Sequence, residues 1–408
     1  MTGAVITGLG ITAPNGLGKQ QYWAAASAGT SGIGPVTRFD PARYPATLAG
    51  EIAGFRPEDL LPARLLPQTD RVTRLALVAA EWALADARVE PARLPEFEMG
   101  VITASTSGGF EFAQGELQQL WSRGSRYVSA YQSFAWFYAV NSGQISIRHG
   151  MKGPGGVVVS DQAGGLDALA QARRQIRKGT SLIVSGAMDA TLCPWGWAAL
   201  WTSGLVSAAG DPSQAYLPFD PRACGHVPGE GGAIVIMESA EHARRRGAHV
   251  YGEVAGYGAT FDARPGSGRE PALRKAIELA LADARTTPAE VDVVFADAAG
   301  TPAQDRIEAA AITAVFGPRA VPVTAPKTMT GRLYSGAGPL DTATALLAMA
   351  EGVIPPTVNV EPGPDHPLDL VVGTARPASL TTALVVARGY GGFNAAVVLR
   401  KPREEVAA

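Results

Sequence analysis

Short apolar runs recur along the chain and alternate with longer segments in which apolar residues follow helical spacing. Continuous runs rich in Val, Ile and Ala are typical of strands that are buried on both faces. We therefore predict strands over residues 4–8, 156–160, 182–186, 232–237, 251–256, 291–295, 321–325, 383–387 and 395–399. The segments between them predict helices over residues 73–87, 166–178, 271–284 and 305–316.

This alternation of strands and helices favours an α/β protein with parallel strand pairing. Residues 182–189 and 384–390 are both strands that run into a glycine-rich corner, one in each half of the chain, which indicates a duplicated unit. We place the boundary between the halves 1–248 and 249–408, because a charged stretch ends at Gly247 and a new strand follows.

Composition places the chain among large globular proteins. Its 408 residues exceed what one hydrophobic core usually supports, and 46% hydrophobic against 18% charged residues excludes a disordered chain. The formal net charge of −2 gives no broad electrostatic reason to bind nucleic acid or an anionic membrane. The 48 glycines and 30 prolines separate the apolar runs, as turns between layers do.

The cysteines, the histidines and the amino terminus bear on the cellular compartment and on metal binding. Cys193 and Cys224 could form at most one disulfide, so a reducing cytoplasm is expected, and we interpret both as buried small residues. The amino terminus lacks the basic stretch of a secretory leader, and no apolar run approaches the roughly 20 residues of a membrane helix. The five histidines show no metal-ligand spacing, so we expect no metal site and interpret them as surface or loop residues.

The residues around 157–165 predict a strand, a sharp corner of small residues and then a helix. Such a corner presents a side chain to a pocket beside a positive helix end, which is the geometry that nucleophiles use. Its apex is Gln162, whose amide cannot ionise at neutral pH or form an acyl-enzyme. From the residues alone, a purely structural corner is the favoured interpretation.

Three stretches together resemble a known family: residues 1–17, residues 219–232 and the corner 389–394 that contains Tyr390. They are similar to signatures of thiolase-type β-ketoacyl synthases and, within that group, of the chain-length factor, or ketosynthase β subunit, of bacterial type II polyketide synthases. The resemblance covers nearly the whole chain. It implies a five-layered αβαβα fold with two related halves.

The same resemblance identifies the positions where catalytic ketosynthases act. Gln162 stands at the family's nucleophile position, Asp297 at its first histidine and Arg332 at its second, whereas Lys327 is retained. This implies a subunit of an acyltransferase complex that itself lacks condensing activity. Whether the chain has an activity of its own stays open.

Helical spacing puts Phe110, Ala113 and Leu117 on one face of a helix. From the residues alone this is an ordinary amphipathic helix buried against a neighbour. The resemblance implies instead that this face lines a polyketide tunnel, together with Trp195.

An aromatic segment follows that helix and contains Phe134, Trp136, Phe137 and Tyr138. Aromatic residues favour both buried cores and subunit interfaces, so the residues alone leave the two alternatives equal. The resemblance favours an interface between subunits.

The resemblance therefore implies a heterodimer with a catalytic ketosynthase α subunit, in which this chain shapes the tunnel that limits a malonyl-derived poly-β-ketone. The growing chain would be carried on the phosphopantetheine of an acyl carrier protein, with no cofactor bound by this chain. Two alternatives stay open: a decarboxylase that primes synthesis from malonyl carrier protein through Gln162, and a degenerate scaffold without a role in the tunnel.

Overall fold

The computed structural model describes residues 3–264, 266–363 and 366–402. One mixed sheet runs through the molecule in the order β13-β11-β10-β15-β16-β9-β1-β8-β7-β5-β6. Its strands are β1 (Ala4–Ala13), β5 (Met99–Ala104), β6 (Gly155–Val158), β7 (Leu182–Asp189), β8 (Gly231–Ser239), β9 (Gly252–Phe261), β10 (Val293–Phe295), β11 (Pro322–Thr324), β13 (Asp369–Leu370), β15 (Thr382–Gly389) and β16 (Phe393–Arg400). Short strands outside this order are β2 (Gly16–Leu17), β3 (Ile33–Pro35), β4 (Leu48–Gly50), β12 (Val353–Ile354) and β14 (Arg376–Pro377).

The two halves of the chain repeat one topology. The first half supplies β1, β5, β6, β7 and β8, and the second supplies β9, β10, β11, β15 and β16. From the middle of the sheet outward, each half places its first strand, then its fifth, fourth, second and third. The predicted duplication is therefore confirmed, and the strands that run into the glycine-rich corners, β7 and β15, occupy equivalent places. The boundary between residues 248 and 249 stays a prediction.

The predicted parallel pairing is correct only towards the two ends of the sheet. Strand β5 is parallel to β6 and β7, and β10 is parallel to β11 and β15. The central series β7-β8-β1-β9-β16-β15 is antiparallel throughout. Both faces of these central strands are covered, so they carry the continuous apolar runs that usually mark parallel strands.

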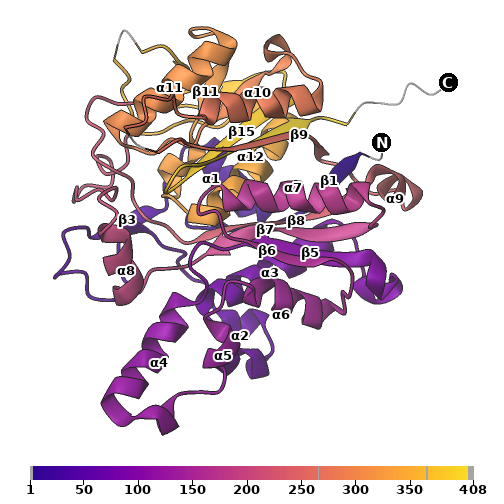
Figure 1. The fold of residues 1–408 in the computed structure, drawn as a ribbon, viewed down its shortest axis with the longest axis vertical. Coiled ribbons are helices and arrows are strands. Elements are labelled where there is room, and N and C mark those ends of the chain that lie inside the picture. The colour runs from indigo at the N-terminus through magenta and orange to yellow at the C-terminus, as the bar shows by residue number, and fades with distance from the viewer. Residues whose placement is uncertain (1–2, 265, 364–365, 403–408) are drawn as a thin grey trace.

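Helices on both sides of the folded sheet build five layers, which Figure 1 shows stacked along the longest axis. Helices α3 and α6 cover the first half's outer face, α10 and α11 cover the second half's outer face, and α7 and α12 lie between the halves. The twelve α-helices of the described residues are α1 (Lys19–Ser27), α2 (Pro57–Leu60), α3 (Arg71–Asp86), α4 (Phe110–Arg123), α5 (Gln132–Ala135), α6 (Val140–His149), α7 (Gly164–Arg177), α8 (Pro194–Trp201), α9 (Ala240–Arg245), α10 (Leu273–Ala284), α11 (Pro302–Phe316) and α12 (Ala337–Glu351).

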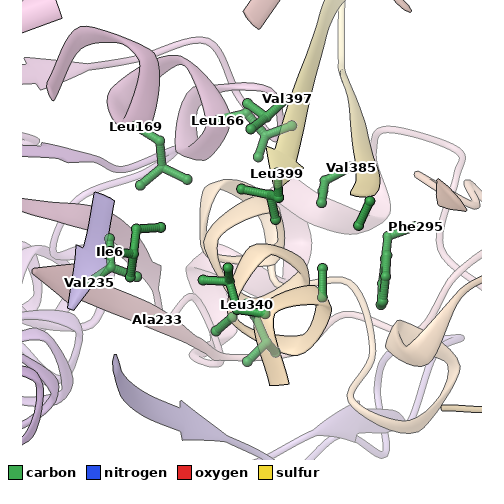
Figure 2. Close-up of a cluster of buried hydrophobic side chains, with 14 of the residues drawn as sticks. Ile6, Leu166, Leu169, Ala233, Val235, Phe295, Leu340, Val385, Val397 and Leu399 are labelled. Atoms are coloured by element: carbon green, nitrogen blue, oxygen red, sulfur yellow. The ribbon is translucent and has the colours of Figure 1, made fainter. Parts of the chain in front are cut away.

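The central core joins the two halves around α12. Figure 2 shows Ile6 and Val235 of the first half facing the same cluster as Val397 of the second half, with Leu340 of α12 among them. Helix α12 is buried along nearly its whole length because small and apolar residues dominate every face of it. Its start lies so close to α7 that a Cβ at Gly165 would come within 2.2 Å of a backbone oxygen.

The predicted helices are present with ends that differ by at most three residues, as 71–86, 164–177, 273–284 and 302–316. The predicted strand over 156–160 ends at Val158, because the following residues form the corner itself. Helices α4 and α5 extend away from the layers at the lower end of Figure 1, and we call residues 110–138 the α4–α5 lobe. Among the described residues, no helix combines the length and the apolar character that crossing a membrane requires.

Candidate functional site

The corner between β6 and α7 carries Gln162, which is only 1% exposed. The preceding residue, Asp161, has a φ of 49°, so the chain turns through the left-handed region there. The carboxylate of Asp161 accepts the backbone N–H of Tyr390 at 2.6 Å. A Cβ at Gly389 would lie 2.7 Å from the carbonyl oxygen of Ser160, so glycine permits this close approach. The corner of the first half is thus held against the glycine-rich corner of the second.

The three residues that the resemblance assigns to the family's catalytic positions meet in one buried network. The amide of Gln162 donates to Asp297 Oδ1 at 2.6 Å. Arg332 Nη2 donates to Asp297 Oδ2 at 2.9 Å, and the backbone N–H of Arg388 donates to Asp297 Oδ1 at 2.8 Å. The exposed fractions of Gln162, Asp297 and Arg332 are 1%, 1% and 7%. The replacements at these three positions therefore bind one another.

This network keeps a carboxylate charged in the interior. Burial alone would raise the pKa of Asp297, but Arg332, Lys327 and Arg388 together hold it below its ordinary value. Burial likewise opposes the charge of Arg332, and Asp297 nevertheless raises the pKa of that guanidinium. The pair is thus ionic at neutral pH, and a nearby enolate would meet a carboxylate rather than a hydrogen-bond donor.

Sequence reasoning missed Glu308, which supports the network from α11. Its two carboxylate oxygens accept the backbone N–H groups of Asp297 at 2.6 Å and Ala298 at 2.8 Å. Burial and the neighbouring Asp297 raise the pKa of Glu308 to about 7. The sequence did contain a signal for it: Asp305, Glu308 and Ile312 follow helical spacing, so the two acidic residues share the face of the buried Ile312.

The retained Lys327 does not reach into an open site. Its Nζ lies 2.7 Å from Asp341 Oδ2 on α12 and donates to the carbonyl oxygen of Ala296, and the residue is 3% exposed. Lys327 therefore ties the segment after β11 to the central helix.

A cavity of about 450 Å³ borders the network. Its walls include Asp161, Asp297, Arg332 and Tyr390, but Gln162 does not line it. The amide of Gln162 is therefore directed into the protein, and its Oε1 is buried and accepts no hydrogen bond within the described residues.

His226 lies in the loop region between α8 and β8, where it lines this cavity and is only 4% exposed, and burial together with Arg332 lowers its pKa to about 3. The imidazole is therefore neutral at physiological pH.

The interpretation of Cys224 as a buried residue is wrong. Cys193 is buried as expected, and burial raises its pKa to about 11, whereas Cys224 is exposed.

The structure brings the predicted tunnel residues to one end of the α4–α5 lobe. The rings of Phe110 and Trp195 are stacked, with centroids 4.6 Å apart and planes inclined by 8°. Leu117 and Trp195 line a shallow groove together with Trp121, whose side chain is 83% exposed. Ala113 is the buried residue of α4 and lies beneath the exposed side of the helix.

The predicted interface aromatics follow in the same lobe. Trp136 and Phe137 are 41% and 47% exposed, and Phe134 and Tyr138 are half-buried. The adjacent strand β6 ends the sheet and pairs with β5 alone among the described strands, and Val159 just beyond it is 49% exposed. An open strand edge therefore lies next to a group of exposed rings.

Residues 2–243 match the family model of the β-ketoacyl synthase N-terminal domain, and residues 251–361 match that of its C-terminal domain. The chain belongs to the β-ketoacyl synthase family. It is 59% identical to the tetracenomycin polyketide synthase ketoacyl synthase beta subunit of Streptomyces glaucescens over 97% of this chain and 98% of that protein.

Solved ketosynthase structures have the same fold. An ishigamide ketosynthase/chain length factor is 30% identical, with a TM-score of 0.90 over 98% of this chain and 99% of the other. A type II polyketide synthase acyl-carrier protein in complex with its ketosynthase includes a chain that is 26% identical, with a TM-score of 0.86 over 98% of this chain and 99% of that chain. The expected five-layered thiolase-like fold is confirmed.

Proposed function

We propose that the chain is the non-condensing chain-length-factor subunit of a type II polyketide synthase. It pairs with a catalytic ketosynthase α subunit and shapes the tunnel that receives a malonyl-derived poly-β-ketone. The growing chain is carried on the phosphopantetheine of an acyl carrier protein, and this subunit contributes no cofactor. The observation that carries the proposal is the buried network of Gln162, Asp297 and Arg332 at the three catalytic positions of the family.

The network explains why condensation belongs to the partner. Acyl transfer needs an ionisable nucleophile and donors aimed at the oxygen where negative charge develops. Gln162 offers no nucleophile, and its N–H group is engaged by Asp297. Arg332 Nη2 also donates to this carboxylate. The same engagement argues against decarboxylation through Gln162.

The α4–α5 lobe and β6 support a protein partner. An open sheet edge and exposed large aromatic rings are both features that proteins cover by association. Trp136, Phe137 and Val159 present both features on neighbouring elements. A ketosynthase α subunit suits them, because a solved relative bears the description ketosynthase/chain length factor.

The tunnel role rests on Phe110, Ala113, Leu117 and Trp195. Elongation stops when the next two-carbon unit has no room, so the side chains along such a channel set the product length. Protein interiors have few voids, and extra volume at a packed position cannot be absorbed elsewhere. Larger side chains should therefore shorten the polyketide by whole two-carbon units.

The test is the mass of the polyketide that the assembled heterodimer makes with its carrier protein. Leu117→Phe should shorten the product, and Phe110→Ala should lengthen it or broaden its distribution. Leu279→Phe is a matched control, because Leu279 on α10 is 39% exposed and Leu117 is 37% exposed. Unchanged products from both Leu117→Phe and Phe110→Ala would remove this helix from length control.

A heterodimer with a catalytically inactive α subunit, given malonyl carrier protein, provides a separate check. We expect no release of carbon dioxide above the uncatalysed rate. Release that Gln162→Ala abolishes would establish the priming decarboxylase in its place.

A further inference from the structure

Helix α4, which carries the proposed length-setting residues, begins without a cap of its own. Its N-cap residue is Gly109, which has no side chain to accept the free N–H groups of the first turn. Unsatisfied N–H groups at a helix start are costly when they are buried, and a side-chain oxygen usually satisfies one of them.

Asp70 supplies the missing cap from another helix. Its Oδ1 accepts the N–H of Val72 at 2.8 Å and so caps α3, of which Asp70 is the N-cap residue. Its Oδ2 accepts the N–H of Phe112 at 2.7 Å in the first turn of α4. Asp70 is 2% exposed, so water does not compete for these bonds. One carboxylate therefore caps two helices.

This junction is tight. A Cβ at Gly109 would lie 2.9 Å from the Cβ of Asp70 and 2.2 Å from the carbonyl oxygen of Ala135. Glycine at this position lets the start of α4 fit between α3 and α5. Beyond its first turn, α4 has one buried residue among those described, Ala113, and a side-chain bond joins it to α8, where Gln114 Oε1 accepts the Trp195 N–H at 2.7 Å.

A small change of angle at the start of α4 would move Leu117. Leu117 lies five residues beyond Phe112, a distance of about 7.5 Å along a helix axis. A tilt of about 15° at the junction would displace Leu117 by about 2 Å at that distance. Loss of the Asp70 bond to Phe112 would favour such a tilt, because the contacts of Phe110 and Gln114 with Trp195 would then hold α4 on the side of α8 alone.

We propose that Asp70 is a positioning residue for chain-length control, because its carboxylate fixes the start of the tunnel helix α4 to the rigid frame at α3. This inference rests on the proposed function. It assigns to Asp70 no contact with the polyketide. The residue acts through the placement of Phe110, Ala113 and Leu117.

Two variants separate the caps. Asp70→Ser and Asp70→Asn both keep an oxygen that can cap α3, and both residues are good N-caps. Neither can accept from Phe112 at the same time, because Asn offers an N–H group there and Ser has a single short oxygen. In the assembled heterodimer with its carrier protein, the ratio of the main product to products one two-carbon unit away should fall up to about tenfold, the factor for one buried hydrogen bond.

Ser239→Ala is the matched control. It removes the side-chain cap of α9, which accepts the N–H of His242 at 3.1 Å, far from α4. This variant should lower stability by a similar amount and leave the product distribution unchanged. A merely structural role for Asp70 predicts that its variants behave like Ser239→Ala.

Amide hydrogen exchange gives a readout that does not depend on product formation. In Asp70→Asn heterodimer, the Phe112 N–H should exchange about tenfold faster, whereas the Val72 N–H stays protected. Unchanged exchange at Phe112, or wild-type product lengths while Leu117→Phe shifts them, would overturn the role of Asp70 and leave the proposed function standing. Unchanged product lengths in the Asp70 variants, Leu117→Phe and Phe110→Ala alike would overturn both.

Discussion

Asp297 and Asp70 are both buried carboxyl groups that accept backbone N–H bonds, yet their surroundings give them opposite properties. Asp297 faces the guanidinium of Arg332, and its pKa is held below the ordinary value despite burial. Asp70 accepts two backbone N–H bonds but no bond from a cation, and burial raises its pKa to about 7. A charged partner, more than depth, decides which buried carboxylate stays ionised.

The Asp297 network and the α4–α5 lobe also differ in how far their polar and apolar groups are covered within the chain. The Asp297 network satisfies its charges within the chain and lies between the two halves of the fold. The α4–α5 lobe leaves Trp121, Trp136 and Phe137 exposed. The Asp297 network is satisfied without a partner protein, whereas the exposed rings of the lobe are suited to contact with one. Four changes test this contrast.

Removing the cation from the network should have the largest effect. Arg332→Ala removes the guanidinium that is paired directly with the buried Asp297, which costs about 3–5 kcal/mol in the free energy of unfolding. Urea unfolding of the assembled complex measures the loss. The control is Arg376→Ala, whose pairing with Asp369 is more exposed and should be worth about 1 kcal/mol or less. Equal losses from the two variants would contradict a special role for the buried pair.

A pH series should distinguish the two aspartates. The pKa of Asp70 is raised on folding, so the folded state binds more protons and the free energy of unfolding falls as pH rises from about 4 to 7, by up to about 1.4 kcal/mol per pH unit. Glu111 strengthens this shift and Arg74 opposes it. Asp70→Asn should flatten the curve in this window. The Asp297 contribution runs the other way, being lost as pH falls below the ordinary pKa of the carboxyl group.

The lobe should govern association rather than folding. Phe137→Ser should weaken the heterodimer about tenfold, corresponding to about 1.4 kcal/mol for one partly exposed aromatic ring. Phe97→Ser is the matched control, because Phe97 is 69% exposed and lies outside the lobe. Titration of labelled subunits gives both dissociation constants. A monodisperse, stable monomer of the wild-type chain in light scattering would count against the lobe as an interface.

The smallest effect is expected at Gln162. Gln162→Ala removes one bond to Asp297, but it also removes a buried amide oxygen that has no partner, so the loss of stability should be about 1 kcal/mol. Polyketide formation by the heterodimer should be largely intact, as product mass and yield will show. Loss of all product from an assembled complex would restore a chemical role to this residue.

The sequence was sufficient to predict the class of fold and its duplication, and its family resemblance singled out Gln162, Asp297 and Arg332. It did not predict that these positions bind one another, because Gln162 and Asp297 are 135 residues apart in the chain. Glu308 was hidden for a similar reason, since the backbone N–H groups that require it belong to a different element. The antiparallel centre of the sheet was missed because burial on both faces removes the alternation that marks antiparallel strands.

The close approach of α7 and α12 determines how this chain can be recombined. Gly165 of the first half faces Pro339 and Ser335 of the second, and a Cβ at Gly338 would lie 2.9 Å from Leu166. The contact between α7 and α12, which we call the seam, therefore has one helix from each half, and glycines on both helices set the distance between them. A chimera cut between residues 248 and 249 inherits two seam surfaces from different parents, and a single added methyl group at Gly165 forces the helices apart. Grafting the α4–α5 lobe leaves this seam intact and is the better way to exchange product length between relatives.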